Sequence, residues 1–308
     1  MNRILLAGLV MLAACESRAP QGGSAADTTA DTTAAAPARI HAIAGFSTPE
    51  GIVHDTTADV YFVSNINGSP GAKDGNGFIS RVRPDGTVDS LRFIEGGRGG
   101  VTLNAPKGMA LKGDTLWVAD IDAMRAFDRR TGAPLRAVEF GSRATFLNDV
   151  AMGPDGMVYV SETGVRFTAS GEMETTGTAG VFRLGSGRSI ELVTRDTALA
   201  GPNGITAHAG RMLMAGFAGP RVFIWTPGQE GLAPAGLSIG GIDGLEVLDD
   251  GRVLASSWED SSIVVVGDSA TRLISGLPAP ADFTIDRGRR RIVVPLFNDD
   301  RVEVWQLP

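Results

Sequence analysis

Six short segments between residues 39 and 308 begin with the side chains best suited to chemistry. Each begins with a carboxylate, an amide or an ammonium group, and the six residues are Glu50, Lys107, Asn148, Asn203, Asp243 and Asp282. Carboxylate and amide oxygens are the ligands that a hard cation such as calcium prefers. The set contains no His or Cys, which argues against zinc or copper. These residue types predict either a calcium site or a cluster of polar side chains hydrogen-bonded to water.

The spacing of these residues indicates a repeated structural unit. Each one is followed by a turn and a short apolar run, and the runs end 13 to 15 residues later at Asn65, Asp120, Glu162, Gly216, Ser257 and Leu296. Successive units start 57, 41, 55, 40 and 39 residues apart, which fits four short strands with turns. A repeat of this length is typical of propellers. We therefore expect an all-β, six-bladed β-propeller with four-stranded blades.

The two ends of the repeat region predict how the ring closes. The last unit stops at Pro308, just after its third strand, and the apolar segment 40–46 precedes the first unit. We expect this N-terminal strand to complete the last blade and remove an open sheet edge. The two long units carry their extra residues at 67–77 and 164–180. These loops should form the walls or lid of a pocket at the channel mouth.

In a propeller the innermost strands surround a central channel, so the six starting residues should form a ring at one mouth. Unpartnered polar groups near a narrow axis are costly, and a shared ion or ordered water would satisfy them. Lys107 either orients an anionic substrate or stabilises an oxyanion, or it forms a salt bridge inside the channel. The predicted substrate-binding residues are Lys107, Asp120, Glu162 and Asp282.

The composition excludes several classes of protein. With 28 Lys and Arg against 35 Asp and Glu, the net charge is -7, and no basic run is long enough to follow a nucleic acid. Cys15 is the only cysteine, which excludes disulfides and a thiol nucleophile in the folded part. The arginine-rich turn 287–291 is either a solvated turn or a contact with lipid headgroups.

The N-terminus carries the signals of export and anchoring. Residues 1–14 are a predicted signal peptide whose apolar run is too short to span a membrane. The segment 12–15, Leu-Ala-Ala-Cys, resembles the lipobox of bacterial lipoproteins, which implies lipidation of Cys15. Residues 15–38 are poor in large apolar side chains and are predicted to be a disordered linker. The resemblance implies a membrane-anchored protein, favouring the outer membrane and facing the periplasm or the cell surface.

The whole of residues 39–308 resembles the gluconolactonase and senescence-marker-protein (regucalcin) family of calcium-dependent lactonase propellers. The resemblance rests on Pro49-Glu50-Gly51, Leu147-Asn148-Asp149, Pro202-Asn203-Gly204 and Ile242-Asp243-Gly244, in this order. It implies that Glu50, Asn148, Asn203 and Asp243 bind Ca²⁺. Phe146 stands where the sugar-lactone enzymes have an arginine, so recognition of a gluconolactone through that side chain is not expected.

These observations predict a calcium-dependent hydrolase, lactonase-like or esterase-like, with a small-molecule lactone or ester as substrate. Asp243 would serve as general base for the attacking water. The alternative is a non-catalytic, lipid-anchored propeller that binds a protein, glycan or small molecule through its long loops.

Overall fold

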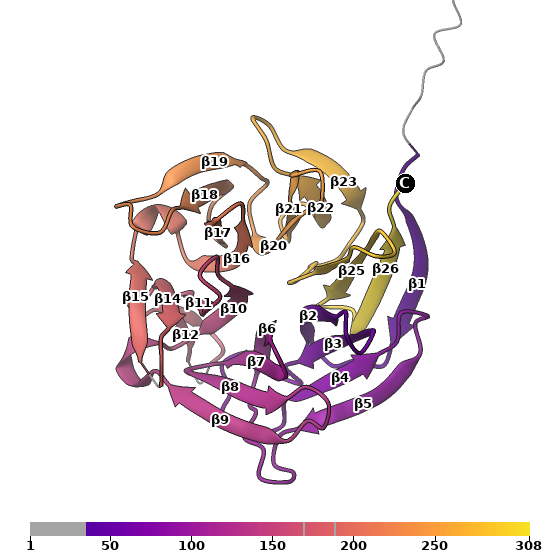
Figure 1. The fold of residues 1–308 in the computed structure, drawn as a ribbon, viewed down its shortest axis with the longest axis vertical. Helices are drawn as coiled ribbons and strands as arrows, with labels where there is room; N and C mark the ends of the chain where they lie inside the picture. Colours follow the sequence, from indigo (N-terminus) through magenta and orange to yellow (C-terminus); the bar gives the residue numbers. More distant parts are fainter. Residues whose placement is uncertain (1–34, 169, 188) are drawn as a thin grey trace, which may run out of the picture. The chain divides into compact units, whose positions relative to one another are not determined.

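Six four-stranded antiparallel sheets surround one axis, and each sheet runs outward from that axis (Figure 1). The structure is a computed structural model that describes residues 35–168, 170–187 and 189–308. The predicted signal peptide, Cys15 and nearly all of the predicted linker lie outside the described residues. The expected six-bladed propeller of four-stranded blades is confirmed. In the described part of the chain, no helix has the length and apolar character needed to cross a membrane.

The strands follow the repeat in order. From the innermost strand outward, the first three blades are β2 (Pro49–Asp55), β3 (Val60–Asn65), β4 (Phe78–Val82) and β5 (Val88–Glu95); β6 (Pro106–Lys112), β7 (Thr115–Asp120), β8 (Ala123–Asp128) and β9 (Pro134–Glu139); and β10 (Leu147–Met152), β11 (Val158–Glu162), β14 (Gly180–Leu184) and β15 (Ile190–Thr194). The last three are β16 (Pro202–His208), β17 (Arg211–Gly216), β18 (Arg221–Trp225) and β19 (Ala233–Leu237); β20 (Ile242–Val247), β21 (Val253–Ser257), β22 (Ser262–Val265) and β23 (Thr271–Ser275); and β24 (Thr284–Asp286), β25 (Arg291–Leu296), β26 (Arg301–Gln306) and β1 (Ala38–Ala44). The connections contain a hairpin, β12 (Val165–Phe167) and β13 (Met173–Thr175), and two short 3-10 turns, η1 (Gly141–Arg143) and η2 (Thr197–Leu199).

The core lies between blades. The middle residues of the second strands are apolar because both faces of these strands are buried, and successive side chains of a strand point to opposite faces. On β3, for example, Phe62 packs with Leu116 of the second blade, whereas Val63 packs with Val304 of the last blade. The apolar runs that mark the repeat in the sequence are therefore the contacts that hold neighbouring blades together.

The N-terminal strand closes the ring as expected. β1 pairs antiparallel with β26, from Ala38 opposite Gln306 to Ala44 opposite Arg301, so the first and last segments of the chain share one sheet (Figure 1). The strand occupies Ala38–Ala44 rather than the expected 40–46. It ends there because Gly45 adopts a φ of 101°, which turns the chain away from the sheet.

A bulge sets the direction of the polar residue at the start of each of the first five inner strands. In each of these strands the register shifts at the polar residue, for instance between Pro49 and Ile52 in the first blade and between Pro202 and Ile205 in the fourth. A bulge of this kind re-aims a side chain. In the first blade the freed Gly51 N–H donates to Ser64 Oγ at 2.7 Å, so the bulge is held by the neighbouring strand.

The glycine that follows the polar residue is required by the narrow axis. A Cβ at Gly51 would lie 2.8 Å from the carbonyl oxygen of Lys107, and one at Gly204 would lie 2.4 Å from that of Asp243. Each of these glycines therefore faces the next blade at a distance that no side chain allows. In the third blade Asp149 replaces the glycine, and its Oδ2 accepts the N–H of Ile205 at 2.7 Å.

Candidate active site

A cavity of about 240 Å³ lies at the channel mouth where the inner strands begin. Its floor contains Glu50, Lys107, Asn148, Asn203 and Asp243, so the structure brings five of the six starting residues together. The two long loops form walls, as expected. Pro70 of the first loop and the β12–β13 hairpin of the second line the cavity.

The two wall segments also touch each other. A Cβ at Gly71 would lie 3.0 Å from the Phe167 ring, so glycine permits this close approach. Phe167 in turn packs against Phe146 with their ring centroids 5.6 Å apart. The loop of the first blade and the hairpin of the third blade therefore cover the cavity together.

The floor of the cavity contains buried oxygens that lack partners. Within the described residues, eight buried side-chain nitrogen or oxygen atoms make no hydrogen bond, and three of them are Glu50 Oε2, Asn203 Oδ1 and Asp243 Oδ1. Buried polar atoms are almost always paired, so this concentration at one place requires an explanation. A hard cation would satisfy all three oxygens at once. The donor set therefore fits calcium.

Amide oxygens are an essential part of this donor set. Within residues 35–168, 170–187 and 189–308, no three His, Cys, Asp or Glu side chains are grouped so that they could hold a metal by themselves. Asn148 donates through its amide nitrogen to Thr163 Oγ1 at 3.1 Å, which leaves its amide oxygen for a cation. Thr163 is fixed in turn because its hydroxyl donates to the Pro202 carbonyl at 2.9 Å.

Asp243 is held by an aromatic residue of the next strand connection. Trp258 donates through its indole N–H to Asp243 Oδ2 at 2.8 Å, while Asp243 Oδ1 is left without a partner. Burial raises the pKa of Asp243 to about 7, although the bond from Trp258 opposes this shift. Burial and the neighbouring Asp243 charge also raise the pKa of Glu50 well above its usual range. Both carboxyls would be ionised more readily beside a cation.

Lys107 is held by carbonyl groups rather than by a salt bridge. Its Nζ donates to the carbonyl oxygens of Pro70 and Ala105, both at 3.1 Å, and lies 4.2 Å from the centre of the Phe146 ring. It makes no ion pair with the residues that the structure describes. Burial lowers its pKa, although the charges of Glu50 and more distant carboxylates oppose this. Since an ammonium group has three N–H donors, one remains for a substrate oxygen.

Asp120 and Glu162, which the sequence predicted as substrate-binding residues, do not line the mouth cavity. Asp120 accepts the backbone N–H groups of Asn104 and Ala105 at 3.0 and 2.9 Å. Glu162 likewise accepts the backbone N–H groups of Thr145 and Phe146. Both carboxylates are fully buried and hold the segment that leads into the inner strand of their own blade. The carboxylate oxygens of Asp120 and Glu162 are therefore occupied by hydrogen bonds from the backbone.

Asp282 faces another part of the channel. It lines a second cavity of about 300 Å³, together with Asp149 and Glu246, and does not line the mouth cavity. Its backbone explains the difference, because its N–H donates to the carbonyl of Glu50 while its carbonyl accepts the N–H of Ile52. At Asp282 the last blade is thus bonded to the first blade, while the preceding Ala281 donates its N–H to the Pro295 carbonyl of β25. Asp282 does not line the mouth cavity, but it lies close enough to the proposed ligands that burial and the charges of Asp149, Glu50 and Asp243 raise its pKa well above its usual range.

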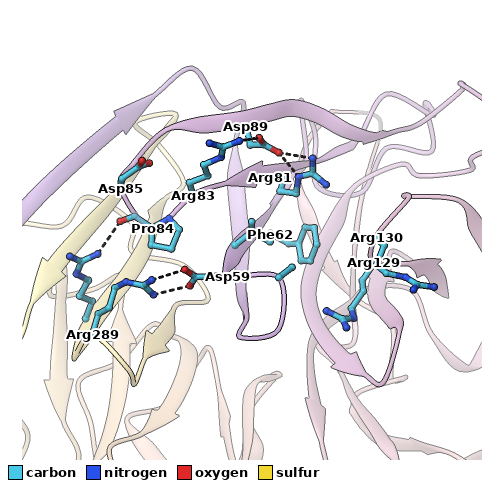
Figure 2. A pocket seen from close by; sticks show the side chains of 13 residues that line it. Asp59, Phe62, Arg81, Arg83, Pro84, Asp85, Asp89, Arg129, Arg130 and Arg289 are labelled. Carbon is cyan, nitrogen blue, oxygen red and sulfur yellow. Dashed lines mark hydrogen bonds and ion pairs between the residues drawn. The ribbon is translucent and has the colours of Figure 1, made fainter.

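A hollow of about 840 Å³ forms an arginine-rich groove outside the channel. Figure 2 shows that its arginines face aspartates: Arg289 is paired with Asp59, and Arg81 and Arg83 are both paired with Asp89. Arg289 and Asp59 belong to the last and first blades. The arginine-rich turn is therefore more than a solvated turn, since it joins these two blades by an ion pair.

Comparisons with known proteins agree with this architecture. No family model matches the sequence, and no curated protein matches it. Among solved structures, a proposed gluconolactonase superposes with a TM-score of 0.64 at 18% identity, covering 88% of this chain and 92% of that one. The chain has the fold of a gluconolactonase-like propeller. A streptogramin B lyase superposes with a TM-score of 0.61 at 11% identity, covering 87% and 97% of the two chains.

A third similar structure is a virginiamycin B lyase from Staphylococcus aureus in complex with quinupristin. It superposes with a TM-score of 0.56 at 13% identity, covering 87% of this chain and 99% of that one. That protein is a histidine-to-alanine variant described as catalytically inactive. At these identities the three comparisons establish the fold of the chain.

Several residues of the site were not among those predicted from the sequence. Trp258, Phe217 and Phe297 line the cavity from segments beyond the second strands of the last three blades. Thr163 follows a second strand directly and orients Asn148. An aromatic residue directly after a second strand is the pattern that could have indicated them, since Phe217, Trp258 and Phe297 each follow their strand directly.

Proposed function

We propose that the protein is a calcium-dependent hydrolase of esters or lactones, with its active site in the mouth cavity. The observation that carries the proposal is the set of three unpartnered buried oxygens on Glu50, Asn203 and Asp243, which line the cavity with Asn148. These are the four residues that the sequence resemblance implies as calcium ligands. When bound there, calcium would supply a Lewis acid for a carbonyl oxygen.

The residues around this position have distinct proposed roles. The Asp243 carboxylate accepts a proton from water, while the indole N–H of Trp258 donates to Oδ2 and fixes the plane of the carboxylate. The water oxygen then bonds to the carbonyl carbon, the ester C–O bond breaks, and the leaving oxygen takes up the proton. Lys107 directs its remaining N–H toward the substrate oxygen that gains negative charge.

A lyase activity like that of the structural neighbours is the second candidate, and the histidines argue against it. The inactive virginiamycin B lyase carries a histidine-to-alanine change. This chain has three histidines, His41, His54 and His208, and none of them lines the mouth cavity. The cavity instead offers carboxylates and a lysine. A hydrolase is therefore the better match to its chemistry.

The test is hydrolysis of a panel of lactones and aryl esters at saturating calcium. Asp243→Asn keeps the shape of the side chain and one oxygen ligand but removes the basicity, so the rate should fall about 10²- to 10⁴-fold. Asp282→Asn is the matched control, because this buried carboxylate lies outside the mouth cavity. Equal rates for the parent and Asp243→Asn would show that Asp243 is not the base. A parent protein that binds calcium yet hydrolyses nothing would favour the non-catalytic binding propeller.

A further inference from the structure

The walls of the mouth cavity are apolar, in contrast to its floor. Nine of the fifteen lining residues are apolar, and these are Ile66, Pro70, Phe146, Val165, Phe167, Met173, Phe217, Trp258 and Phe297. Five of the nine are aromatic. The charged and amide groups therefore form one end of a cavity whose remaining surface favours apolar groups.

The aromatic side chains form two continuous walls. On one side, Phe217 and Trp258 pack with ring centroids 5.6 Å apart, and Trp258 and Phe297 pack at 5.0 Å. On the other side, Phe146 packs against Phe167 of the hairpin. Such edge and tilted packing leaves ring faces and edges for a further aromatic or branched group.

The N–H and O–H donors that line the cavity are mostly engaged by other protein groups, and its unpartnered oxygens are those assigned to calcium. The amide N–H of Asn148 is bonded to Thr163, whose own hydroxyl is bonded to a carbonyl. The indole N–H of Trp258 donates to Asp243, and the Lys107 ammonium donates two hydrogen bonds to backbone carbonyls. Several hydroxyl groups of a sugar lactone would lie against the aromatic walls without partners, which costs binding free energy.

The entrance is apolar as well. Met173 is 63% exposed and Phe217 is 36% exposed, and both line the cavity. Most large apolar side chains of the described residues are buried, so exposed ones at a cavity entrance point to an apolar ligand. The cavity volume of about 240 Å³ is somewhat below the roughly 300–1,000 Å³ of typical ligand pockets, so the ligand is small. This is enough for one ring and a short ester linkage.

We propose that the substrate is an uncharged ester or lactone carrying one aromatic or branched apolar group, and that polyhydroxylated sugar lactones are rejected. This inference rests on the proposed hydrolase function for the reaction, but its claim about binding can be tested separately. The apolar group lies between the two aromatic walls, and the carbonyl points toward the floor that holds Glu50, Lys107 and Asp243.

The first experiment compares two lactones of similar size and opposite polarity, dihydrocoumarin and D-glucono-1,5-lactone, with the full chain at saturating calcium. We expect kcat/KM to favour dihydrocoumarin at least 100-fold. Phe217→Ala should raise KM for dihydrocoumarin about tenfold with little change in kcat. Leu192→Ala is the control, since Leu192 is also an exposed apolar residue but does not line the cavity. Equal or better hydrolysis of the gluconolactone would overturn the inference while leaving the hydrolase proposal intact.

The second experiment measures binding without turnover. In 2-tetralone a methylene replaces the ring oxygen of dihydrocoumarin, so the compound keeps the shape but cannot be hydrolysed. It should bind and change the tryptophan fluorescence, and Trp258→Phe should abolish the change. If 2-tetralone binds but no ester is hydrolysed, the apolar specificity stands and the hydrolase proposal fails. If 2-tetralone does not bind at concentrations well above those of the kinetic assay, the inference is wrong.

Discussion

The chemistry of the site centres on one residue, Asp243. Its two carboxylate oxygens have different surroundings, because one is held by Trp258 and the other is buried without a partner. Its position was predictable from the Asp-Gly start of the repeat, whereas its partner Trp258 was not. A hydrogen bond between a strand start and a residue beyond the next strand depends on the three-dimensional arrangement of the blade.

Calcium binding should depend on pH because protons compete for the same carboxylates. Burial raises the pKa of Asp243 to about 7, compared with about 4 in an unfolded chain. Without calcium, this group favours the folded state below pH 4, and that contribution is lost as the pH rises through 7. Calcium requires the ionised form, so its affinity should fall at least about tenfold per pH unit below 7 and level off above 8.

Calcium titrations between pH 5.5 and 8.5 would measure this dependence. Unfolding midpoints in chelator and in excess calcium provide a second readout, since calcium should stabilise the protein more at pH 8 than at pH 6. An affinity that stays constant across this range would contradict the assignment of Asp243 as a buried ligand.

Removing the Lys107 ammonium group should strengthen calcium binding and lower the free energy of unfolding. Lys107→Met deletes a buried positive charge beside the proposed ligands, and we expect calcium affinity to rise roughly tenfold, or about 1.4 kcal/mol. The carbonyls of Pro70 and Ala105 lose their donor, which should cost about 1–3 kcal/mol of stability. The exposed Lys112→Met is the control. Weaker calcium binding in Lys107→Met would mean that the lysine supports the metal site.

At the scale of elements, the strands could be predicted from the sequence because two packing requirements recur in every blade and produce the repeat. The apolar runs mark second strands buried on both faces, and the polar-Gly pairs mark bulges that face the next blade across a narrow axis. The pairing of the last inner strand could not be foreseen. Asp282 matches the repeat in type and spacing, but its backbone is bonded to Glu50 and Ile52 of the first blade.

The close approach of inner strands can be tested at Gly204. In Gly204→Ala the new methyl group would lie 2.4 Å from the carbonyl oxygen of Asp243, so the two strands must separate. We expect a loss of about 1–3 kcal/mol of stability and weaker calcium binding. Gly219→Ala is the control, because its Cβ would meet only Ala200 at 3.8 Å. Denaturant unfolding measures both variants, and equal stability would show that the glycine is not required at that position.

At the scale of the whole molecule, the sequence predicted the position of the site better than its lining. Five starting residues meet at one cavity because the propeller brings all inner strands to one axis. Asp120 and Glu162 were harder to assign, since a buried carboxylate that holds a backbone segment looks the same in the sequence as one that faces a ligand. Phe217, Trp258 and Phe297 directly follow second strands of the repeat, but only the folded blades show that these positions face the cavity.

We also propose that the protein is exported and anchored through Cys15, which lies outside the described residues. Cys15→Ser should release the protein from membranes or block processing of the signal peptide. Membrane fractionation and the mass of the mature N-terminus would show the change. Unaltered fractionation and processing would mean that the segment 12–15 does not function as a lipobox.

The proposed function depends on one calcium ion that binds at the mouth cavity. Calorimetric titration of calcium into the metal-free protein at pH 8 tests it most directly, with Asp243→Asn and Asp282→Asn measured alongside the parent. We predict one calcium per chain, an affinity at least tenfold lower in Asp243→Asn, and a clearly smaller loss in Asp282→Asn, whose charge acts on the site but whose side chain does not line it. The account would be contradicted by a parent protein that binds no calcium, or by a loss of affinity in Asp282→Asn as large as that in Asp243→Asn.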